Sequence, residues 1–208
     1  MNFIQQKKIP NITPQFFPCI NNKNVQTIPI KKFEWARDKN CNLNAQNYTD
    51  NYGGKLQLGW RYSSLGNVLL RIVAHCVIKD DDGKLFCVTP SENDYEKTIN
   101  FIPDDSIIEY NGRLPSYTIP IINNTLIAEW AKLECLHSEV RMKYSSRQSL
   151  SDNTSSVKLT DEDSLKMTFI NKRFHELIQK VELLALNSYQ PNDLCHCASG
   201  LKFKKCCK

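Results

Sequence analysis

Residues 68–83, with the sequence VLLRIVAHCVIKDDDG, decide the fold class of this 208-residue chain. Their first eleven residues are mostly apolar and rich in branched side chains, as is typical of a central strand buried on both faces. The DDDG run at residues 80–83 predicts a tight hairpin turn, so residues 84–89 return as an antiparallel partner until Pro90 ends it. The stretch therefore predicts an antiparallel sheet with residues 68–78 as a central strand.

Two further strands flank this hairpin in the sequence. Residues 55–62 alternate apolar and polar side chains, which is the period of a strand with one buried face. Residues 98–102 form another short apolar run, and Pro103 ends it. Residues 107–122 are mixed in character and carry two prolines, so we expect them to loop back over the sheet.

Three segments are predicted helices, and each follows a residue that favours the N-cap position. They are residues 41–52 after Asn40, residues 125–143 after Asn124 and residues 161–187 after Thr160. The glycine pair at residues 53–54 ends the first helix. Apolar side chains recur along the last helix at alternating spacings of four and three residues, which predicts a stripe that packs on the preceding helix or on a partner.

The order of these elements predicts an α+β fold. It comprises an antiparallel sheet, an N-terminal helix that begins at Cys41, two C-terminal helices and a small cysteine-rich knuckle. A polar, serine-rich stretch separates the two C-terminal helices. The predicted units are residues 1–143 as the α+β domain, 144–160 as a polar linker or loop, 161–190 as an amphipathic helix and 191–208 as the knuckle.

The excess of positive charge is small outside the C-terminal tail. The chain carries 27 basic and 22 acidic residues, which gives a net charge of +5. Four lysines against one aspartate give residues 191–208 a charge of +3, so the remainder is only mildly basic. Nucleic acid is therefore a weaker candidate partner than protein.

The cysteines favour a reducing compartment. Nine are present, and outside the tail they form an odd set at irregular spacing: Cys19, Cys41, Cys76, Cys87 and Cys135. Such a set argues against a disulfide framework. No apolar run approaches the roughly twenty residues of a membrane span, and the N-terminus lacks the apolar core of a signal peptide. We therefore expect a soluble, cytoplasmic protein.

The tail itself, residues 195–208 with the sequence CHCASGLKFKKCCK, has the pattern of a thiolate metal site. A CxC pair and a CC pair are separated by a turn and a basic segment, so a tight reversal brings the pairs together. Four sulfur ligands in tetrahedral arrangement suit zinc. The alternative is a pair of disulfides or a reactive tail, although CxC and CC pairs are strained when they close on themselves.

Residues 191–207, PNDLCHCASGLKFKKCC, resemble the SEC-C motif, the zinc knuckle at the C-terminus of the SecA preprotein translocase ATPase. That family follows the pattern NDxCxCGSGxK(Y/F)KxC(H/C). This chain departs from it at His196, where proline is usual, at Ala198, where glycine stands, and at Leu201, where lysine is usual. The resemblance implies one zinc ion with four ligands, namely Cys195, Cys197, Cys206 and Cys207.

The same resemblance implies a partner. In SecA the motif contacts the SecB chaperone and the ribosome. We therefore expect the knuckle to recruit a protein with an acidic, chaperone- or ribosome-like surface, and we take a protein-interaction adaptor as the first functional hypothesis. A nucleic-acid binder that uses the basic knuckle is the third.

A second candidate site gives the second hypothesis, a cysteine hydrolase or acyltransferase that the knuckle targets to its substrate. Cys41 begins a predicted helix and His75 lies in a predicted strand, which is the arrangement of papain-like and NlpC/P60-like thiol hydrolases. A helix N-terminus and an imidazole both lower the pKa of a thiol. The thiolate would attack an acyl carbon, and the imidazolium would protonate the leaving group. Asn44 or the backbone N–H of Cys41 would hold the oxyanion.

Several short motifs between residues 40 and 105 also resemble a set of uncharacterised bacterial proteins with this Cys-His pattern. They are CNLN at 41–44, GW at 59–60, AH at 74–75, DGKL at 82–85, VTP at 88–90 and FIPD at 101–104. The chain departs from that pattern at Cys87, where an aspartate stands, and a triad would need such a group to orient its histidine.

The register of the hairpin decides where Cys87 lies. A four-residue loop pairs His75 with Val88, whereas a three-residue loop with a bulge pairs it with Thr89 and brings Cys87 to the same face. Under the alternative hypothesis these cysteines and His75 are core residues without a chemical role.

Overall fold

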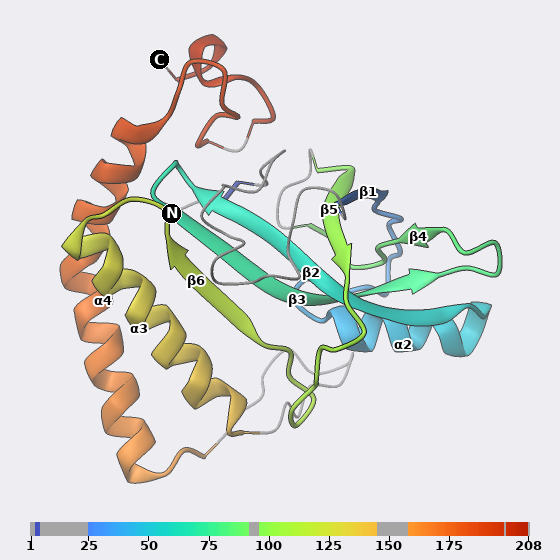
Figure 1. The fold of residues 1–208 in the computed structure, drawn as a ribbon. Helices are drawn as coiled ribbons and strands as arrows, with labels where there is room; N and C mark the ends of the chain where they lie inside the picture. Colours follow the sequence, from blue (N-terminus) through green and yellow to red (C-terminus); the bar gives the residue numbers. More distant parts are fainter. Residues whose placement is uncertain (1–2, 5–24, 92–95, 145–157, 198, 208) are drawn as a thin grey trace.

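The computed structural model describes residues 3–4, 25–91, 96–144, 158–197 and 199–207. It has the predicted α+β fold, with an antiparallel sheet, a helix that begins at Cys41, two C-terminal helices and a C-terminal cysteine cluster (Figure 1). The strands are β1 (Gln26–Pro29), β2 (Lys55–Leu65), β3 (Leu69–Lys79), β4 (Leu85–Phe86), β5 (Thr98–Pro103) and β6 (Ser116–Pro120). The helices are α2 (Cys41–Tyr52), α3 (Thr125–Met142), α4 (Asp161–Ser188) and the 3-10 turn η1 (Phe203–Lys205).

β2 and β3 form the centre of the sheet. They pair over their whole length, from Lys55 opposite Lys79 to Leu65 opposite Leu69. β5 pairs with β2, and β1 pairs with β5. Both β4 and β6 pair with β3, each along a different part of the strand, and all these pairings are antiparallel. Among the described strands, β4, β5 and β6 thus pair directly with the β2–β3 hairpin, and β1 joins it through β5.

The sheet curls until its two outer members meet. Cys87, which follows β4, donates its backbone N–H to the carbonyl of Pro29 at 2.9 Å, and the N–H of Lys31 donates to the carbonyl of Cys87 at 2.8 Å. These bonds form a short parallel bridge between Ile30 and Cys87. The sheet is therefore nearly a closed barrel, which pairs backbone groups that an open edge would expose.

The inside of the curled sheet holds a small apolar cluster. Its buried members are Ile28, Val77, Cys87, Ile99 and Phe101. Gly59 of β2 makes room for this cluster, because a Cβ at that position would lie 2.3 Å from the ring of Phe101 and 2.3 Å from the carbonyl oxygen of Ile102. Any larger residue at position 59 would displace the interior.

The helices pack on opposite faces of the sheet, since α2 contacts Cys76 and Ile78 of β3 whereas α3 contacts Arg71. α2 packs on the outer face of β3, where Ala45 lies in one apolar cluster with Cys76 and Ile78. α3 packs along β6, and α4 packs on α3 (Figure 1). The stripe predicted on α4 lies in this second interface, where Ile170, Leu177 and Val181 are buried and Phe174 and Leu184 are partly buried.

Glu134 anchors α3 to the sheet. Its carboxylate accepts hydrogen bonds from Arg71 Nε at 3.1 Å, Trp130 Nε1 at 2.9 Å and Thr118 Oγ1 at 2.8 Å. The guanidinium of Arg71 also donates through Nη2 at 2.5 Å. A carboxylate that is mostly removed from water is tolerated only when it is paired in this way.

The predicted helices are confirmed, with every end within one residue. The side chain of Asn124 accepts from the N–H groups of Leu126 and Ile127, and that of Thr160 accepts from the N–H of Asp163, as expected for N-caps. Asn40 precedes α2 as predicted, but its side chain makes no capping hydrogen bond.

β6 is not among the predicted strands. It follows Pro115 and ends with Pro120, which masked its extended pattern. Prolines are tolerated here because β6 pairs only with β3 among the described strands, so its other side needs no N–H donors. The predicted linker falls mostly on residues 145–157, which lie outside the described residues, as does Cys19.

Among the described residues, we find no helix with the length and apolar character that crossing a membrane requires.

Candidate metal centre

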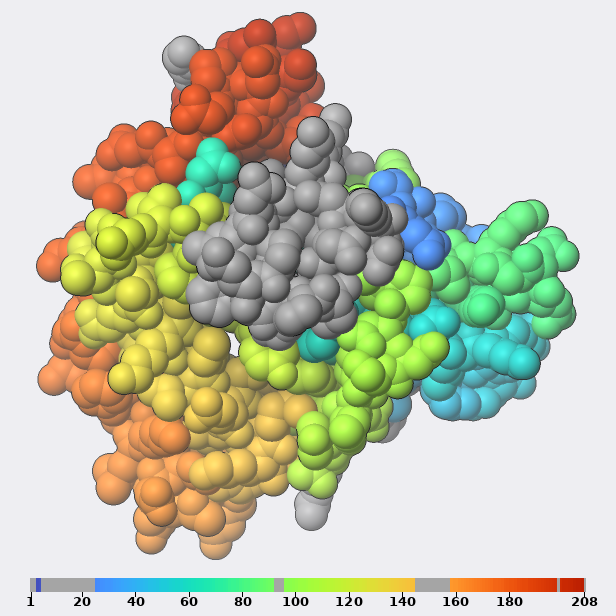
Figure 2. Space-filling view, viewed as in Figure 1, coloured from blue at the N-terminus to red at the C-terminus, as the bar shows by residue number. Residues whose placement is uncertain are grey.

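The four cysteines of the tail converge on one point. The sulfur atoms of Cys195, Cys197, Cys206 and Cys207 all lie within 4.8 Å of one another. The chain reaches them in two arms. Cys195 and Cys197 follow the end of α4, and Cys206 and Cys207 follow η1. The structure describes the knuckle at residues 191–197 and 199–207, and Figure 2 shows it as a projection beyond the C-terminal end of α4.

Short-range backbone bonds bring the two arms together. Leu194 and Lys202 form an antiparallel bridge, and the N–H of Cys195 donates to the carbonyl of Leu201 at 2.8 Å. Gly200, at φ +76°, reverses the chain between them. The carbonyl of Phe203 then accepts from the N–H groups of both Cys206 and Cys207, at 3.1 and 3.2 Å, which turns that pair back toward the first.

The spacing of the sulfur atoms suits a metal ion. Cys197 Sγ lies 3.4 Å from Cys195 Sγ and 3.3 Å from Cys206 Sγ, and Cys206 and Cys207 are 3.8 Å apart. Four sulfurs at about 2.3 Å from a tetrahedral metal would lie about 3.8 Å from one another. A disulfide would need a separation of about 2.05 Å. The cluster therefore fits a four-sulfur metal site better than the alternative pair of disulfides.

The four cysteines of the cluster differ in their exposure to solvent and in the direction of their pKa shifts. Cys195 is buried, whereas the other three cysteines are exposed. Burial raises the pKa of the Cys195 thiol. Hydrogen bonding by Ser199, together with the neighbouring thiols of Cys206 and Cys195, lowers the pKa of Cys197 to about 6. Deprotonation, which metal binding requires, is thus favoured at one sulfur of the cluster before any metal arrives.

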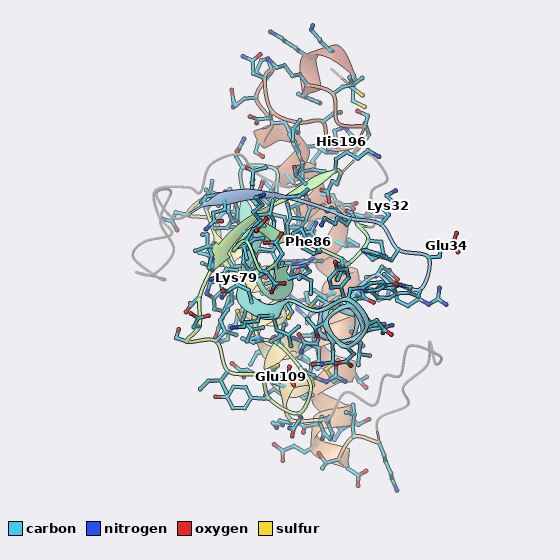
Figure 3. All side chains as sticks on the ribbon, turned by 90° about the vertical axis from the view of Figure 1, so that its right-hand side faces the viewer. Lys32, Glu34, Lys79, Phe86, Glu109 and His196 are labelled. Carbon is cyan, nitrogen blue, oxygen red and sulfur yellow. The ribbon has the colours of Figure 1, made fainter. Side chains whose placement is uncertain are left out.

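Three aromatic rings join the knuckle to α4. The ring of Tyr189, just after α4, lies 5.9 Å from His196 and 5.6 Å from Phe203, and those two rings are 5.9 Å apart. His196, which stands where the SEC-C pattern has proline, is therefore part of an aromatic contact and not of the sulfur cluster. Figure 3 shows His196 at the knuckle, far from Phe86 and Lys79 of the sheet.

The second candidate pair, Cys41 and His75, is not brought together. Cys41 packs on the outer face of β3, in the cluster that contains Cys76. His75 lies between Ala74 and Cys76 in the strand, so its side chain points to the opposite, inner face. There its Nε2 lies 3.1 Å from the sulfur of Cys87. The Cys41 thiol and the His75 imidazole, which form the candidate catalytic pair in the sequence, therefore lie on opposite faces of β3.

The structure decides between the two hairpin registers. Ile78 pairs with Phe86 and Lys79 with Leu85. Continued by three residues, this register places Thr89 opposite His75 and puts Cys87 on the same inner face, which is the second of the two predicted alternatives.

The buried His75–Cys87 pair is electrically neutral. Burial, with a smaller effect from Arg61, lowers the pKa of His75 to about 3. Burial also raises the pKa of Cys87 to about 11. At neutral pH neither a thiolate nor an imidazolium forms here, and both side chains are almost wholly removed from solvent. Burial raises the pKa of Cys41 as well. These features fit the alternative in which the residues are core residues.

Some residues around the knuckle have no signal in the sequence pattern. Tyr189 lies before the motif, and Asn67 lies in the β2–β3 turn, yet both contact the knuckle. Asn67 is 126 residues from its partner Asp193, so no local spacing could have linked them.

Comparisons with known proteins agree with this geometry at the C-terminus alone. No curated protein and no solved structure matches the chain. The family described as the SEC-C motif matches residues 192–208, which include all four clustered cysteines. The papain-like resemblance receives no support from these comparisons or from the positions of Cys41 and His75. The chain thus carries a C-terminal SEC-C motif whose four cysteines form a cluster that could hold a metal ion.

Proposed function

We propose that this protein is a zinc-dependent interaction adaptor. In this proposal the knuckle binds one zinc ion through Cys195, Cys197, Cys206 and Cys207, and the folded knuckle recruits a protein with an acidic surface. The observation that carries it is the four-sulfur cluster within the SEC-C motif. We also propose a reducing compartment, the cytoplasm, because the odd and irregularly spaced set of cysteines outside the tail argues against a disulfide framework.

Zinc is the metal that this donor set favours. Four thiolates in tetrahedral arrangement select zinc over hard cations, which prefer oxygen ligands. With four protein ligands no coordination position is open to a substrate, so the role is structural. The knuckle has few buried side chains of its own, and metal binding would supply the free energy that orders it.

The exposed surface of the knuckle favours an acidic partner. Lys202, Lys204 and Lys205 are exposed, and Leu201, at 52% exposure, adds an apolar contact among them. A zinc ion with four thiolates carries a formal charge of −2, and the three lysines exceed it by one positive charge. The exposed positive charge of the lysines therefore favours a negatively charged surface on another molecule. Chaperone and ribosomal proteins, which the SEC-C motif contacts in SecA, are the partners to test first.

The test uses the full chain, first for metal and then for binding. Zinc content of the protein purified under reducing conditions should be one ion per chain by mass spectrometry. Binding of purified SecB and of ribosomes is then measured by interferometry, before and after a chelator removes the metal. Loss of binding on chelation, with recovery when zinc is added back, supports the adaptor role. Binding that survives chelation would overturn it.

A charge-reversal variant separates the lysines from the metal. In Lys202→Glu/Lys204→Glu/Lys205→Glu, zinc content should remain at one per chain. Binding should weaken about a hundredfold or more, because like charges across an interface cost several kcal/mol. The matched control is Lys166→Glu/Lys172→Glu/Lys180→Glu on α4, which makes the same change of charge away from the knuckle. Binding to RNA with a steep salt dependence, and none to protein, would instead favour the nucleic-acid hypothesis.

A further inference from the structure

The turn between β2 and β3 contacts the chain at the start of the knuckle. Asn67 donates from Nδ2 to the carbonyl of Ser188 at 2.8 Å and to the carboxylate of Asp193 at 2.9 Å. Its backbone N–H donates to Ser188 Oγ at 2.8 Å. The N–H of Gly66 donates to the hydroxyl of Tyr189 at 3.2 Å. Four hydrogen bonds thus join this turn to residues 188–193.

Asp193 links the β2–β3 turn to both arms of the knuckle through hydrogen bonds. The carboxylate oxygen that accepts from Asn67 also accepts from the N–H of Gln190 at 2.7 Å. The backbone carbonyl of Asp193 accepts from the N–H of Phe203, in the second arm, at 2.8 Å. Two residues further on, the first arm reaches Cys195. Asp193 is therefore the point where the domain, the first arm and the second arm meet.

The turn fits closely against the end of α4. Gly66 has a φ of +52°, and a Cβ at this position would lie 2.4 Å from Ser188 Oγ and 2.6 Å from the carbonyl oxygen of Ala185. Only glycine permits this approach. Because Tyr189 is largely buried and its ring also contacts Phe203, the contact continues into the knuckle without a flexible break.

We propose that the β2–β3 turn, through Asn67, is a positioning part of the metal centre that lies outside the SEC-C motif. Asn67 holds Asp193, and Asp193 holds the two arms at the separation that the metal requires. This proposal rests on metal binding by the knuckle. It adds that metal binding and the docking of the knuckle on the domain stabilise each other, since coupling between two sites is reciprocal.

The coupling has a structural consequence for partner recruitment. A knuckle on a flexible tether would present its lysines in many directions. A knuckle docked by Asn67 and by the ring of Tyr189 presents Lys202, Lys204 and Lys205 in one direction relative to the sheet. The partner then meets a surface of defined orientation, which lowers the entropy lost on binding.

The first test measures zinc affinity of the full chain by competition with a chromogenic chelator. We expect Asn67→Ala to weaken zinc binding by about tenfold to a hundredfold, the usual effect of losing a group that orients a metal site. Asn51→Ala, the same change on the exposed side of α2, is the matched control and should leave affinity unchanged. An unchanged affinity in Asn67→Ala would overturn the proposal.

A double-mutant cycle shows whether Asn67 acts through Asp193. Neither residue is a metal ligand, so both variants keep all four thiols. If Asn67 acts through this carboxylate, Asn67→Ala should have little further effect on affinity in an Asp193→Ala background. Fully additive losses would show that Asn67 acts by another route and would overturn the assignment.

Hydrogen exchange of the wild-type chain gives a test that needs no variant. The amides of Gly66 and Asn67 donate to Tyr189 and Ser188, so removal of zinc should speed their exchange at least several-fold. The amide of Ala74, bonded to the carbonyl of Pro115, lies within the sheet and should not change. Unchanged protection of the turn amides in a chain that binds zinc would overturn the coupling alone. A wild-type chain that binds no zinc would overturn both this proposal and the adaptor function.

Discussion

Cysteine side chains lie in different environments in the knuckle and in the interior of the sheet. In the knuckle four thiols face one another, and three of them are exposed near lysines. In the sheet, Cys76 and Cys87 are buried among apolar side chains, and burial raises the pKa of both thiols. A cysteine is therefore a metal ligand or a small apolar core residue according to its neighbours.

The largest expected effect is the loss of metal from the double variant Cys206→Ser/Cys207→Ser. Removing two of four thiolates leaves too few ligands for a closed site, so zinc content should fall from one per chain to zero. The sheet should keep its cooperative unfolding transition, because its buried clusters contain no knuckle residue. Zinc analysis and urea unfolding monitored by circular dichroism measure the two effects. Retained zinc would contradict the four-ligand assignment.

Alkylation by iodoacetamide near neutral pH is the next test, and it separates the two sets of thiols by rate. With zinc bound, the knuckle cysteines should react slowly. After chelation the exposed Cys197 should react faster than Cys41 or Cys87 by roughly a hundredfold or more, since reactivity follows exposure and thiolate fraction. Peptide mass spectrometry over time gives the rate at each site.

The same experiment tests the hydrolase hypothesis. Because burial raises the pKa of Cys41, it should react no faster than Cys135, which serves as the internal reference. A Cys41 that reacts much faster than Cys135 in the native chain would restore the case for a nucleophile at this position.

The third prediction concerns pH and the buried histidine. The pKa of His75 is about 3 in the folded chain and near its ordinary value of 6.5 in the unfolded chain. Between these values the unfolded chain binds a proton that the folded chain does not, so acid favours unfolding. The contribution of His75 to stability is complete above about pH 6.5 and is lost toward pH 3, by about 1.4 kcal/mol per pH unit.

His75→Phe should remove this dependence. The free energy of unfolding in urea is measured at pH 7, 6 and 5 for both proteins, and the wild-type curve should fall more steeply by that amount. Parallel curves would show that His75 has the same pKa in the folded and unfolded chains, as an imidazole in contact with solvent would. That result would contradict the neutral, buried character of the pair.

The two sites also differ in how far the sequence predicts them. The four ligands of the knuckle lie within thirteen positions, and backbone bonds inside that segment bring them together, so their spacing alone indicates the site. The central hairpin and the helices were predictable for the same reason, because periodicity and caps are local features.

Contacts between distant elements were not predictable in this way. The sequence places Cys41 at the start of a helix and His75 in a strand, but it does not show which face of that strand the helix covers. A step of one residue exchanges His75 for Cys76. The contact of Asn67 with Asp193 depends on the whole path of the chain between them. β6 was hidden because the prolines at its ends are acceptable only on a strand whose outer side is unpaired, which is itself a tertiary property.

The smallest expected effect is a change in stability, without loss of zinc, when Cys87 is substituted. In Cys87→Ser a hydroxyl replaces the thiol 3.1 Å from His75 Nε2 and keeps a hydrogen-bond partner for the ring, whereas Cys87→Ala removes that partner. Burying the hydroxyl should cost about 1–2 kcal/mol of stability, and the alanine variant should lose about 1 kcal/mol more than the serine variant. Zinc content should stay at one per chain in both, because the sulfur of Cys87 belongs to a different cluster. Urea unfolding and zinc analysis of the two variants measure these quantities together. Equal stability of the two variants would mean that His75 does not depend on Cys87, and a loss of zinc from either would show that the two sets of cysteines are not independent.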